Sequence, residues 1–501
     1  MTFLWTAESI ATATGGRWLV QPALDWSPNR ISYDVSGNMA GHFCVLTDPG
    51  TWGAARVDAS PHVPRMIAQG AAGIMLQSSH LTELSTAGSV IPQGFPALLV
   101  ENTYTALRAM AVAARARFGG TVFAITGTVG KTTTREMIRH ITDQQGGAVA
   151  SAANNNNISG VWRSLTNAPQ NHAALVLEMG FGRPLDGIAR SAIVAKPHVA
   201  VLTTMDVAHF DMFTPKMLAQ KTGLQWLCDL KSTVFSGLEP GGAAILGREM
   251  AEYGRAKVLA LAQTARVYSY GLTSDCDARL EAIELDPTGS VVQATVAGRP
   301  LRFRLNVLGR HMAVNALGAL LATWAGGFDL AAAVGAIEGF APVKGRARVD
   351  QIPLAAGGTA VLIDDSFNAT LASMRSTLAL LADAKPQGLG RRIAVLGEIG
   401  HIGADEIDQH RNLVHAVKNA GVDRVFAWGP LMRGMFEALD PHQQGDWQEA
   451  SVESLYQSVI ADLRHGDVIT IKSGRGQGGL GDFRFRKFAE HLRAAAPALV
   501  L

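Results

Sequence analysis

Short apolar runs rich in β-branched residues alternate along the chain with longer segments rich in alanine and leucine. Apolar runs of this length predict strands buried on both faces, and the longer segments predict helices. The predicted strands are Val122–Thr126, Ala174–Leu177, His198–Thr203, Thr359–Asp364, Ile393–Leu396, Arg424–Trp428 and Val468–Ile471. A helical pattern follows most of these strands, so the sequence predicts parallel βαβ units and an α/β fold.

Interruptions of this pattern predict three domains, and 501 residues exceed what one hydrophobic core usually supports. A predicted helix, Tyr104–Arg117, is followed by a glycine break that ends the first domain. The polar, alternating stretch Ala265–Leu305 predicts antiparallel strands within the second domain. The helical run Met312–Gly339 then gives way to a new strand-rich segment. The predicted domains cover residues 1–118, 119–343 and 344–501.

The charge balance argues against nucleic acid as the main partner. The net charge is only +2, whereas binding to phosphate backbones requires concentrated lysine and arginine. The basic stretch Arg484–Lys487 is too short to change this, and we interpret it as a solvated face.

The remaining composition predicts a cytoplasmic protein. The three cysteines (Cys44, Cys228 and Cys276) are far apart and odd in number, which predicts reduced thiols. The N-terminus lacks the basic region of a signal peptide. The longest apolar candidate, Ala316–Phe328, is too short to span a membrane.

The segment TVFAITGTVGKTTTREMI, residues 121–138, predicts a phosphate-binding loop between a strand and a helix. Its glycines let backbone N–H groups approach phosphate oxygens, and Lys131 can neutralise the β- and γ-phosphates. The loop residues are Gly127, Thr128, Gly130, Lys131, Thr132 and Thr133. Two residues separate the glycines where four are usual, so this is a shortened variant. The alternative is a glycine-rich turn that binds nothing.

The loop and an ordered series of further motifs resemble the Mur ligase family, and most closely its MurF branch, which adds D-Ala-D-Ala. The loop signature TGTxGKTTT is shared with folylpolyglutamate synthetases. The further motifs are SAANNNNISG (151–160), LEMG (177–180), VLTTMDVAHFDMF (201–213), GRHMAVN (309–315), Gly345-Arg346 and IDDSFNA (363–369). The resemblance implies an N-terminal substrate-binding domain, a central ATP-binding domain with a parallel sheet, and a C-terminal Rossmann-like domain that binds the amino acid.

The resemblance implies ATP and Mg²⁺ as cofactors. Thr132, Glu178 and His209 would hold the metal ion, although hard Mg²⁺ prefers oxygen to imidazole nitrogen. A helix-capping role for Glu178 and a structural role for His209 are the alternatives. Many members also carry a lysine carbamate that bridges two magnesium ions. Lys221 lies at a comparable distance after His209, but Gly223 stands where the family has a glutamate, and an exposed helix residue is the alternative.

Other motif residues take their expected roles from the same resemblance. Asn315 would contact the adenine, Arg346 the γ-phosphate and Asp365 the ribose. A helix cap is the alternative for Asn315 and Asp365, and a surface ion pair for Arg346. The residues expected to bind the substrates are Asn156, Asn157, Asn368, Lys472 and Arg475.

The expected activity is ATP-dependent amide-bond formation, in which a carboxylate becomes an acyl phosphate and an amine such as that of D-Ala-D-Ala displaces phosphate. Positions that handle the substrates depart from the family pattern. Tyr33–Ser36 lacks the expected arginine, and His401-Ile402-Gly403 replaces a Glu-Leu-Gly motif. A MurF-like paralogue of secondary metabolism, a folylpolyglutamate-type ligase and a non-catalytic nucleotide-binding partner are the alternatives. We expect small-molecule substrates and a monomer or weak oligomer.

Overall fold

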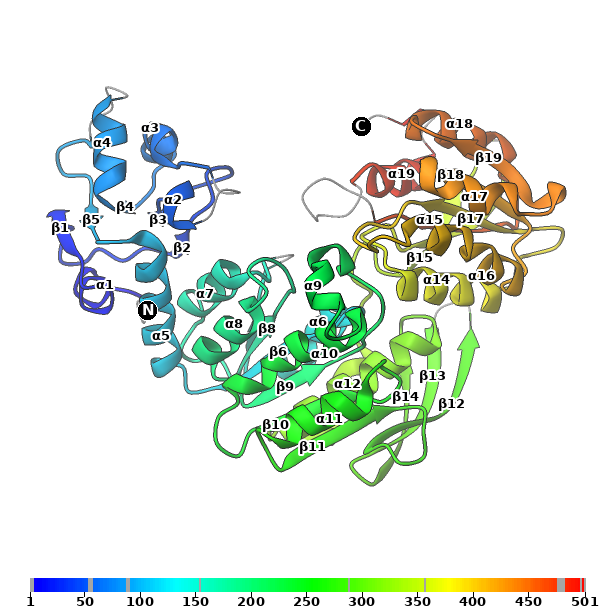
Figure 1. The fold of residues 1–501 in the computed structure, drawn as a ribbon, viewed down its shortest axis with the longest axis horizontal. Helices are drawn as coiled ribbons and strands as arrows, with labels where there is room; N and C mark the ends of the chain where they lie inside the picture. The colour runs from blue at the N-terminus through cyan, green and yellow to red at the C-terminus, as the bar shows by residue number, and fades with distance from the viewer. Residues whose placement is uncertain are drawn as a thin grey trace. The chain divides into compact units, whose positions relative to one another are not determined.

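A computed structural model of the chain describes residues 4–52, 57–86, 91–152, 155–286, 289–355, 357–474, 483–495 and 498–499. Figure 1 shows the helices and strands of the chain. Contacts between residues divide the chain into two units. Unit 1 comprises residues 1–124, 145–199 and 233–242, and unit 2 comprises residues 125–144, 200–232 and 243–501.

The first sheet lies in unit 1, with strand order β1-β5-β4-β3-β2. Its strands are β1 (Arg17–Val20), β2 (Arg30–Ser32), β3 (His42–Val45), β4 (Gly73–Leu76) and β5 (Ala97–Leu99). Strands β2 to β5 are parallel, and β1 runs antiparallel to β5. The accompanying helices are α1 (Ala7–Thr14), α2 (Pro49–Trp52), α3 (Val63–Ala68), α4 (Ser78–Thr86) and α5 (Thr103–Arg117). Helix α5 begins after an Asn102 cap and matches the predicted Tyr104–Arg117 helix within one residue at its start.

The second sheet has the order β14-β13-β12-β11-β10-β9-β6-β8-β7. Its strands are β6 (Thr121–Thr126), β7 (Ala148–Ala150), β8 (Ala174–Glu178), β9 (Val199–Leu202), β10 (Ala243–Gly247), β11 (Arg266–Gly271), β12 (Ala278–Asp286), β13 (Gly289–Val296) and β14 (Arg299–Leu305). Every residue of β8, β9 and β10 is buried, which explains their uninterrupted apolar sequences.

The prediction of antiparallel strands over Ala265–Leu305 was wrong for its first strand. β11 pairs in parallel with both β10 and β12, and only β12, β13 and β14 form an antiparallel meander. The buried Tyr270 explains the difference, because a Cβ on Gly318 of a covering helix would lie 2.8 Å from its ring. β11 is therefore part of the helix-covered parallel sheet rather than of the exposed meander.

The helices that accompany the second sheet are α6 (Lys131–Asp143), α7 (Ile158–Thr166), α8 (Gly187–Ala195), α9 (Pro215–Leu218), α10 (Gly223–Ser232), α11 (Tyr253–Leu261), α12 (Arg310–Ala325) and α13 (Leu330–Glu338). The helical run predicted over Met312–Gly339 is thus two helices, separated by Gly326 and Gly327.

The third sheet lies in unit 2, with the order β15-β16-β20-β17-β18-β19. Its strands are β15 (Arg348–Pro353), β16 (Thr359–Asp364), β17 (Arg392–Gly397), β18 (Arg424–Trp428), β19 (Gln444–Gln448) and β20 (Val468–Lys472). All pairs are parallel except β15 with β16. The helices are α14 (Leu371–Asp383), α15 (Glu406–Arg411), α16 (Leu413–Asn419), α17 (Arg433–Glu437), α18 (Val452–Asp462) and α19 (Phe483–Arg493). Figure 1 shows α14 and α16 on one side of this sheet and α18 and α19 on the other.

The α/β fold class is confirmed by these three sheets. The predicted strands Thr359–Asp364 and Arg424–Trp428 coincide with β16 and β18 at both ends. The three cysteines are free thiols, two of them buried, as predicted. Among the described residues, no helix combines the length and apolar character that crossing a membrane requires.

Candidate functional site

The loop after β6 is fastened to the end of β9. Gly127 has φ 146°, and a Cβ there would lie 2.0 Å from Oγ1 of Thr203, so no other residue fits. The N–H of Thr128 donates to the carbonyl of Thr204 at 2.7 Å. The carbonyl of Val129 accepts hydrogen bonds from the hydroxyls of Thr203 and Thr204 at 2.6 and 3.1 Å. These bonds fix the shortened loop from the side of the neighbouring strand.

The loop leads into the N-terminus of α6, where the backbone can bind an anion. The first N–H groups of a helix have no acceptor within the helix and carry its positive dipole end. Lys131 is the first residue of α6, and its Nζ donates to the carbonyls of Gly127 and Thr128 at 2.9 and 3.0 Å. Thr132 and Thr133 are buried beside it. The predicted loop residues therefore lie together in the arrangement that holds phosphates.

Asn315 lies against this loop. It is the sixth residue of α12, well inside the helix, so the helix-cap alternative does not apply. A Cβ on Gly130, which has φ 87°, would lie 2.7 Å from Oδ1 of Asn315. A glycine at this position therefore allows the amide to approach the loop.

A second lysine, Lys231, reaches the same loop and was missed by the sequence analysis. It is only 1% exposed, and its Nζ donates to the carbonyl of Gly127 at 2.9 Å. Burial lowers its pKa well below the ordinary value, and the positive charge of Lys131 lowers it further. A signal was present in the sequence, because Lys231 follows the buried Leu227 by four residues on one helix face.

His209 belongs to the same electrostatic environment. Burial lowers its pKa to about 3, with further contributions from the positive charges of Lys231 and Lys131. The imidazole is therefore neutral at pH 7. Its backbone is left-handed, with φ 59°.

Lys221 lies in an ion-pair network of its own. Its Nζ donates to Oδ2 of Asp229 at 2.6 Å and lies 4.9 Å from the ring centroid of Trp226. Arg255 binds the same carboxylate at 2.5 and 2.8 Å. The Lys221 side chain is 37% exposed. This placement agrees with the exposed-residue alternative, and a catalytic role for Lys221 stays a prediction.

In unit 1 the asparagine-rich turn orients a buried carboxylate. Glu178 ends β8 and is 2% exposed. Its Oε1 accepts a hydrogen bond from Nδ2 of Asn156 at 2.9 Å, and its N–H donates to Oγ of Ser151 at 3.0 Å. Glu178 does not cap a helix. Asn157 does, because its side chain accepts from the N–H of Gly160 at the start of α7.

A third group of predicted residues meets at the ends of β16 and β20. The buried Lys472 forms an ion pair with Asp365 and donates to the carbonyl of Asn368 at 3.1 Å. Burial lowers the pKa of Lys472, and the charge of Asp365 opposes this. Thr377 of α14 also donates to Asp365, which does not cap that helix. Arg475 lies outside the described residues.

Arg346 lies beside this group. It follows Gly345, which has φ 72°, and its guanidinium carbon is 4.4 Å from the ring centroid of Phe367. Its charge contributes to the lowered pKa of Lys472. The start of α12 is also near, because the pKa of the half-buried His311 is lowered by burial and also responds to the charges of Asp365 and Lys472.

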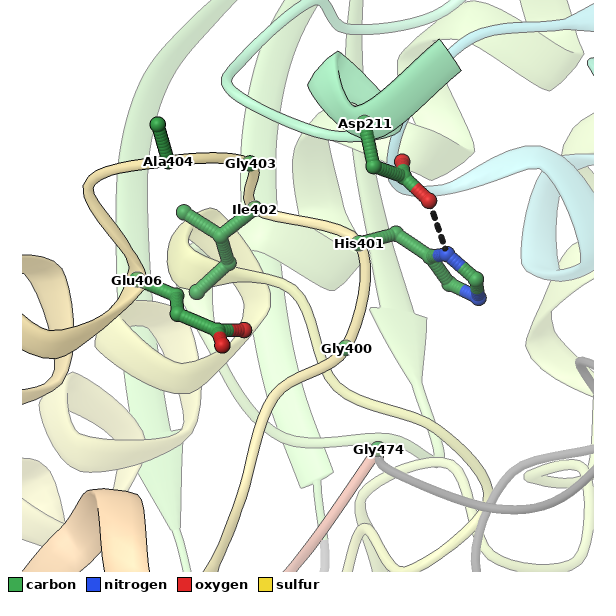
Figure 2. Close-up of a pocket in the computed structure, with 8 residues that line it drawn as sticks. All are labelled: Asp211, Gly400, His401, Ile402, Gly403, Ala404, Glu406 and Gly474. Carbon is green, nitrogen blue, oxygen red and sulfur yellow. Dashed lines mark hydrogen bonds and ion pairs between the residues drawn. The ribbon is translucent and has the colours of Figure 1, made fainter.

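Unit 2 also contains a pocket of about 480 Å³, and the divergent motif His401-Ile402-Gly403 forms part of its wall (Figure 2). Nδ1 of His401 lies 2.9 Å from Oδ2 of Asp211, and its ring stacks on His209 with centroids 5.5 Å apart. The pocket-lining residues are Asp211, Gly400, His401, Ile402, Gly403, Ala404, Glu406 and Gly474. Carboxylates on two lining residues, Asp211 and Glu406, suit a positively charged ligand group.

Comparisons with known proteins connect these groups to one family. Residues 125–323 match the Mur ligase middle domain, and residues 347–475 match the Mur ligase, glutamate ligase domain. The UDP-N-acetylmuramoyl-tripeptide–D-alanyl-D-alanine ligase of Bacillus subtilis is 27% identical over 390 residues, which cover 77% of this chain and 80% of the relative.

Solved structures show the same fold. The crystal structure of MurF from Acinetobacter baumannii matches with a TM-score of 0.78 at 24% identity and covers 98% of both chains. The MurF ligase from Thermotoga maritima, solved in complex with ADP, matches with a TM-score of 0.73 at 18% identity. It covers 93% of this chain and 97% of its own.

Proposed function

Because the chain belongs to the Mur ligase family, we propose that it is an ATP-dependent ligase that joins a carboxylate to the amine of D-Ala-D-Ala or a similar small amino acid. The observation that carries the proposal is the phosphate loop fastened to β9, with Lys131 at the head of α6. The fastened loop needs little further ordering when the phosphates bind.

In the proposed reaction, an oxygen of the carboxylate substrate attacks the γ-phosphorus of ATP, ADP leaves, and an acyl phosphate forms. The amine nitrogen then attacks the acyl carbon, inorganic phosphate leaves, and the nitrogen loses a proton. Lys131 and the N–H groups of the loop would neutralise the phosphates, and Arg346 would bind the γ-phosphate. Asn315 and Asp365 would position adenine and ribose. No side-chain nucleophile is required.

Thr132, Glu178 and His209 would hold Mg²⁺. The hydroxyl and the carboxylate are hard oxygen donors, and Glu178 is oriented by Asn156. His209 can offer a lone pair because its lowered pKa keeps the ring neutral. The ion, when bound, neutralises charge on the phosphates. In the described part of the chain, no three His, Cys, Asp or Glu side chains form a complete metal site, so oxygen atoms of the nucleotide and water would complete the coordination.

We propose Lys231, in place of Lys221, for the carbamate role. Only a neutral amine reacts with CO₂, giving a carbamate and a proton. Burial favours the neutral form of Lys231, and its Nζ lies beside the phosphate loop. Lys221 is instead paired with Asp229, away from the loop carbonyls that Lys231 and Lys131 contact.

The pocket of Figure 2 would receive the incoming amine, whose ammonium group matches Asp211 and Glu406. We also propose the division into domains at residues 118/119 and 343/344. A cytoplasmic location is supported by the free thiols and by the need for ATP.

The proposed function is tested by incubating the chain with ATP, Mg²⁺, D-Ala-D-Ala and a panel of carboxylates that includes UDP-MurNAc-tripeptide. Product is detected by mass and phosphate release by a colorimetric assay. We expect phosphate release that depends on both substrates and disappears in Lys131→Ala. A wild-type chain that releases no phosphate with any pair would contradict the proposal.

One observation favours a second candidate, a ligase with a different carboxylate substrate. Where an arginine is expected near Tyr33–Ser36, the nearby cation is the buried Arg163 of α7. Its Nη1 donates to Oδ2 of Asp34 at 2.7 Å, and its guanidinium carbon is 4.7 Å from the Tyr33 ring centroid. Asp34 therefore neutralises the charge that a diphosphate would need. We expect weak binding of UDP-MurNAc-tripeptide in calorimetry, and micromolar affinity would exclude this candidate.

A further inference from the structure

The basic stretch Arg484–Lys487 is only in part the solvated face that the sequence predicts, because Lys487 is exposed whereas Arg484 and Arg486 are half-buried. It lies in α19, where Phe485 and Phe488 are fully buried against the third sheet. The guanidinium carbon of Arg486 lies 5.6 Å from the ring centroid of Phe367. This arginine therefore faces the motif that contains the proposed ribose contact.

Phe367 is a platform for two guanidinium groups. It stands between Asp365 and Asn368, and its N–H donates to the carbonyl of Gly345 at 3.1 Å. Arg346 contacts its ring at 4.4 Å, and Arg486 reaches the same ring from α19. Two arginines on one ring concentrate positive charge beside the proposed site.

The charge of Arg486 is not balanced by a neighbouring acid. Within the described residues, its Nε is buried without a hydrogen-bond acceptor, and no carboxylate pairs with it. Other cations of α19 differ, because Lys487 lies 3.5 Å from Glu490, and Arg493 binds Asp350 at 2.7 Å. A partly buried guanidinium without an acceptor is costly unless a ligand supplies one.

We propose that Arg486 is a substrate-binding residue that, beside the proposed γ-phosphate contact Arg346, binds an oxyanion over the edge of Phe367. We assign this oxyanion to the carboxylate of the incoming amino acid, and this assignment rests on the proposed function. A guanidinium presents its donors as a planar fork that matches a carboxylate.

The placement of the pocket supports this assignment. Gly474 lines the pocket, and a Cβ on it would lie 2.6 Å from the backbone nitrogen of Ala369, two residues after Phe367. An amino acid with its ammonium group at Asp211 and Glu406 would extend its carboxylate along this wall towards Arg486. The proposed contacts to the ATP phosphates are the loop around Lys131 and Arg346, which leaves Arg486 for the carboxylate.

Equilibrium binding tests the proposal without requiring turnover. Calorimetry measures the binding of three ligands: D-Ala-D-Ala, its C-terminal amide, and a non-hydrolysable ATP analogue with Mg²⁺. Each ligand is titrated into wild type, Arg486→Gln and Arg486→Lys. Lys487→Gln is the matched control, because it removes the same charge from the next residue of α19. Arg486→Gln should weaken binding of D-Ala-D-Ala about tenfold or more and leave the amide unaffected. Arg486→Lys should restore little of the affinity for D-Ala-D-Ala, because an ammonium group lacks the planar fork of donors.

The outcomes separate the possibilities. If Arg486→Gln weakens binding of the ATP analogue but not of D-Ala-D-Ala, then Arg486 binds a phosphoryl group. That result would overturn the carboxylate assignment. Equal affinities in wild type, Arg486→Gln and Lys487→Gln would overturn the proposal, and so would a wild-type chain that binds none of the ligands. A chain that binds D-Ala-D-Ala through Arg486 but forms no amide would instead refute the proposed ligase activity.

Discussion

Replacing Lys231 by methionine should separate stability from activity. The substitution keeps most of the apolar volume and removes the hydrogen bond from Nζ to the carbonyl of Gly127. A hydrogen bond from a neutral donor is worth about 0.5–1.5 kcal/mol. Burial favours the neutral amine of Lys231 while the unfolded chain keeps the ammonium, and the variant avoids the free-energy cost of this deprotonation, which offsets the lost hydrogen bond. We expect an unchanged or increased free energy of unfolding, together with a rate loss of roughly 10³-fold, or about 4 kcal/mol.

The pH dependence of stability provides a second measurement on the same variant. The pKa of Lys231 is lowered in the folded chain, so between that pKa and about 10.5 only the unfolded chain binds the extra proton. The free energy of unfolding of the wild-type chain should therefore increase with pH across this window. The increase should be smaller for Lys231→Met.

Urea denaturation at pH 7 and 9.5 and phosphate release with and without added bicarbonate give both results. Lys221→Met is the comparison, since it removes a surface ion pair worth about 1 kcal/mol or less. Near-normal turnover of a folded Lys231→Met variant would refute the role proposed for this lysine.

Three further predictions concern the other parts of the site. Lys131→Ala should keep the circular dichroism spectrum and lose roughly 10³-fold in phosphate release, and near-normal release would remove it from the site. With Mg²⁺ and an ATP analogue, the radius of gyration in solution scattering should decrease, and Arg346→Ala should abolish much of this decrease. Identical scattering curves for wild type and Arg346→Ala, with and without nucleotide, would remove Arg346 from the site. His209 stays neutral down to about pH 3, whereas the unfolded chain protonates below about 6.5, so its contribution to stability is complete above 6.5 and is lost towards pH 3. His209→Asn, which tolerates the positive φ, should lose less stability than wild type between pH 7 and 4.5, and equal losses would contradict this.

The parallel sheets were predictable because their strands are covered on both faces. The strands β16 and β18 are nearly continuous apolar runs between polar residues or glycine, so both ends of each strand could be read from the sequence. The strands of the first sheet, such as β2, are short and left no such run. The assignment of β11 to the antiparallel group failed because strand direction depends on which neighbour it pairs with, a long-range property.

Local motifs indicated which residues meet, but not which lysine joins them. The phosphate loop is contiguous in sequence, so its glycines and Lys131 could be identified together. Lys231 is 100 residues away, and only the folding of α10 against the loop shows that it shares an acceptor with Lys131. Arg486 was misjudged for a similar reason, since four basic or aromatic residues in a row do not reveal what the helix packs against.

The carbonyl oxygen of Gly127 accepts both Lys131 and Lys231 in the same state of the chain. A carbonyl has two lone pairs, so it can serve both amines at once. When a phosphate attracts Lys131, the carbonyl oxygen of Gly127 loses that donor but keeps the hydrogen bond from Lys231. A buried acceptor is therefore not left without a hydrogen bond. Lys231 thus remains hydrogen-bonded to this carbonyl while one nucleotide leaves the loop and another binds. Lys131 can therefore turn towards a bound phosphate while the carbonyl of Gly127 stays hydrogen-bonded to Lys231.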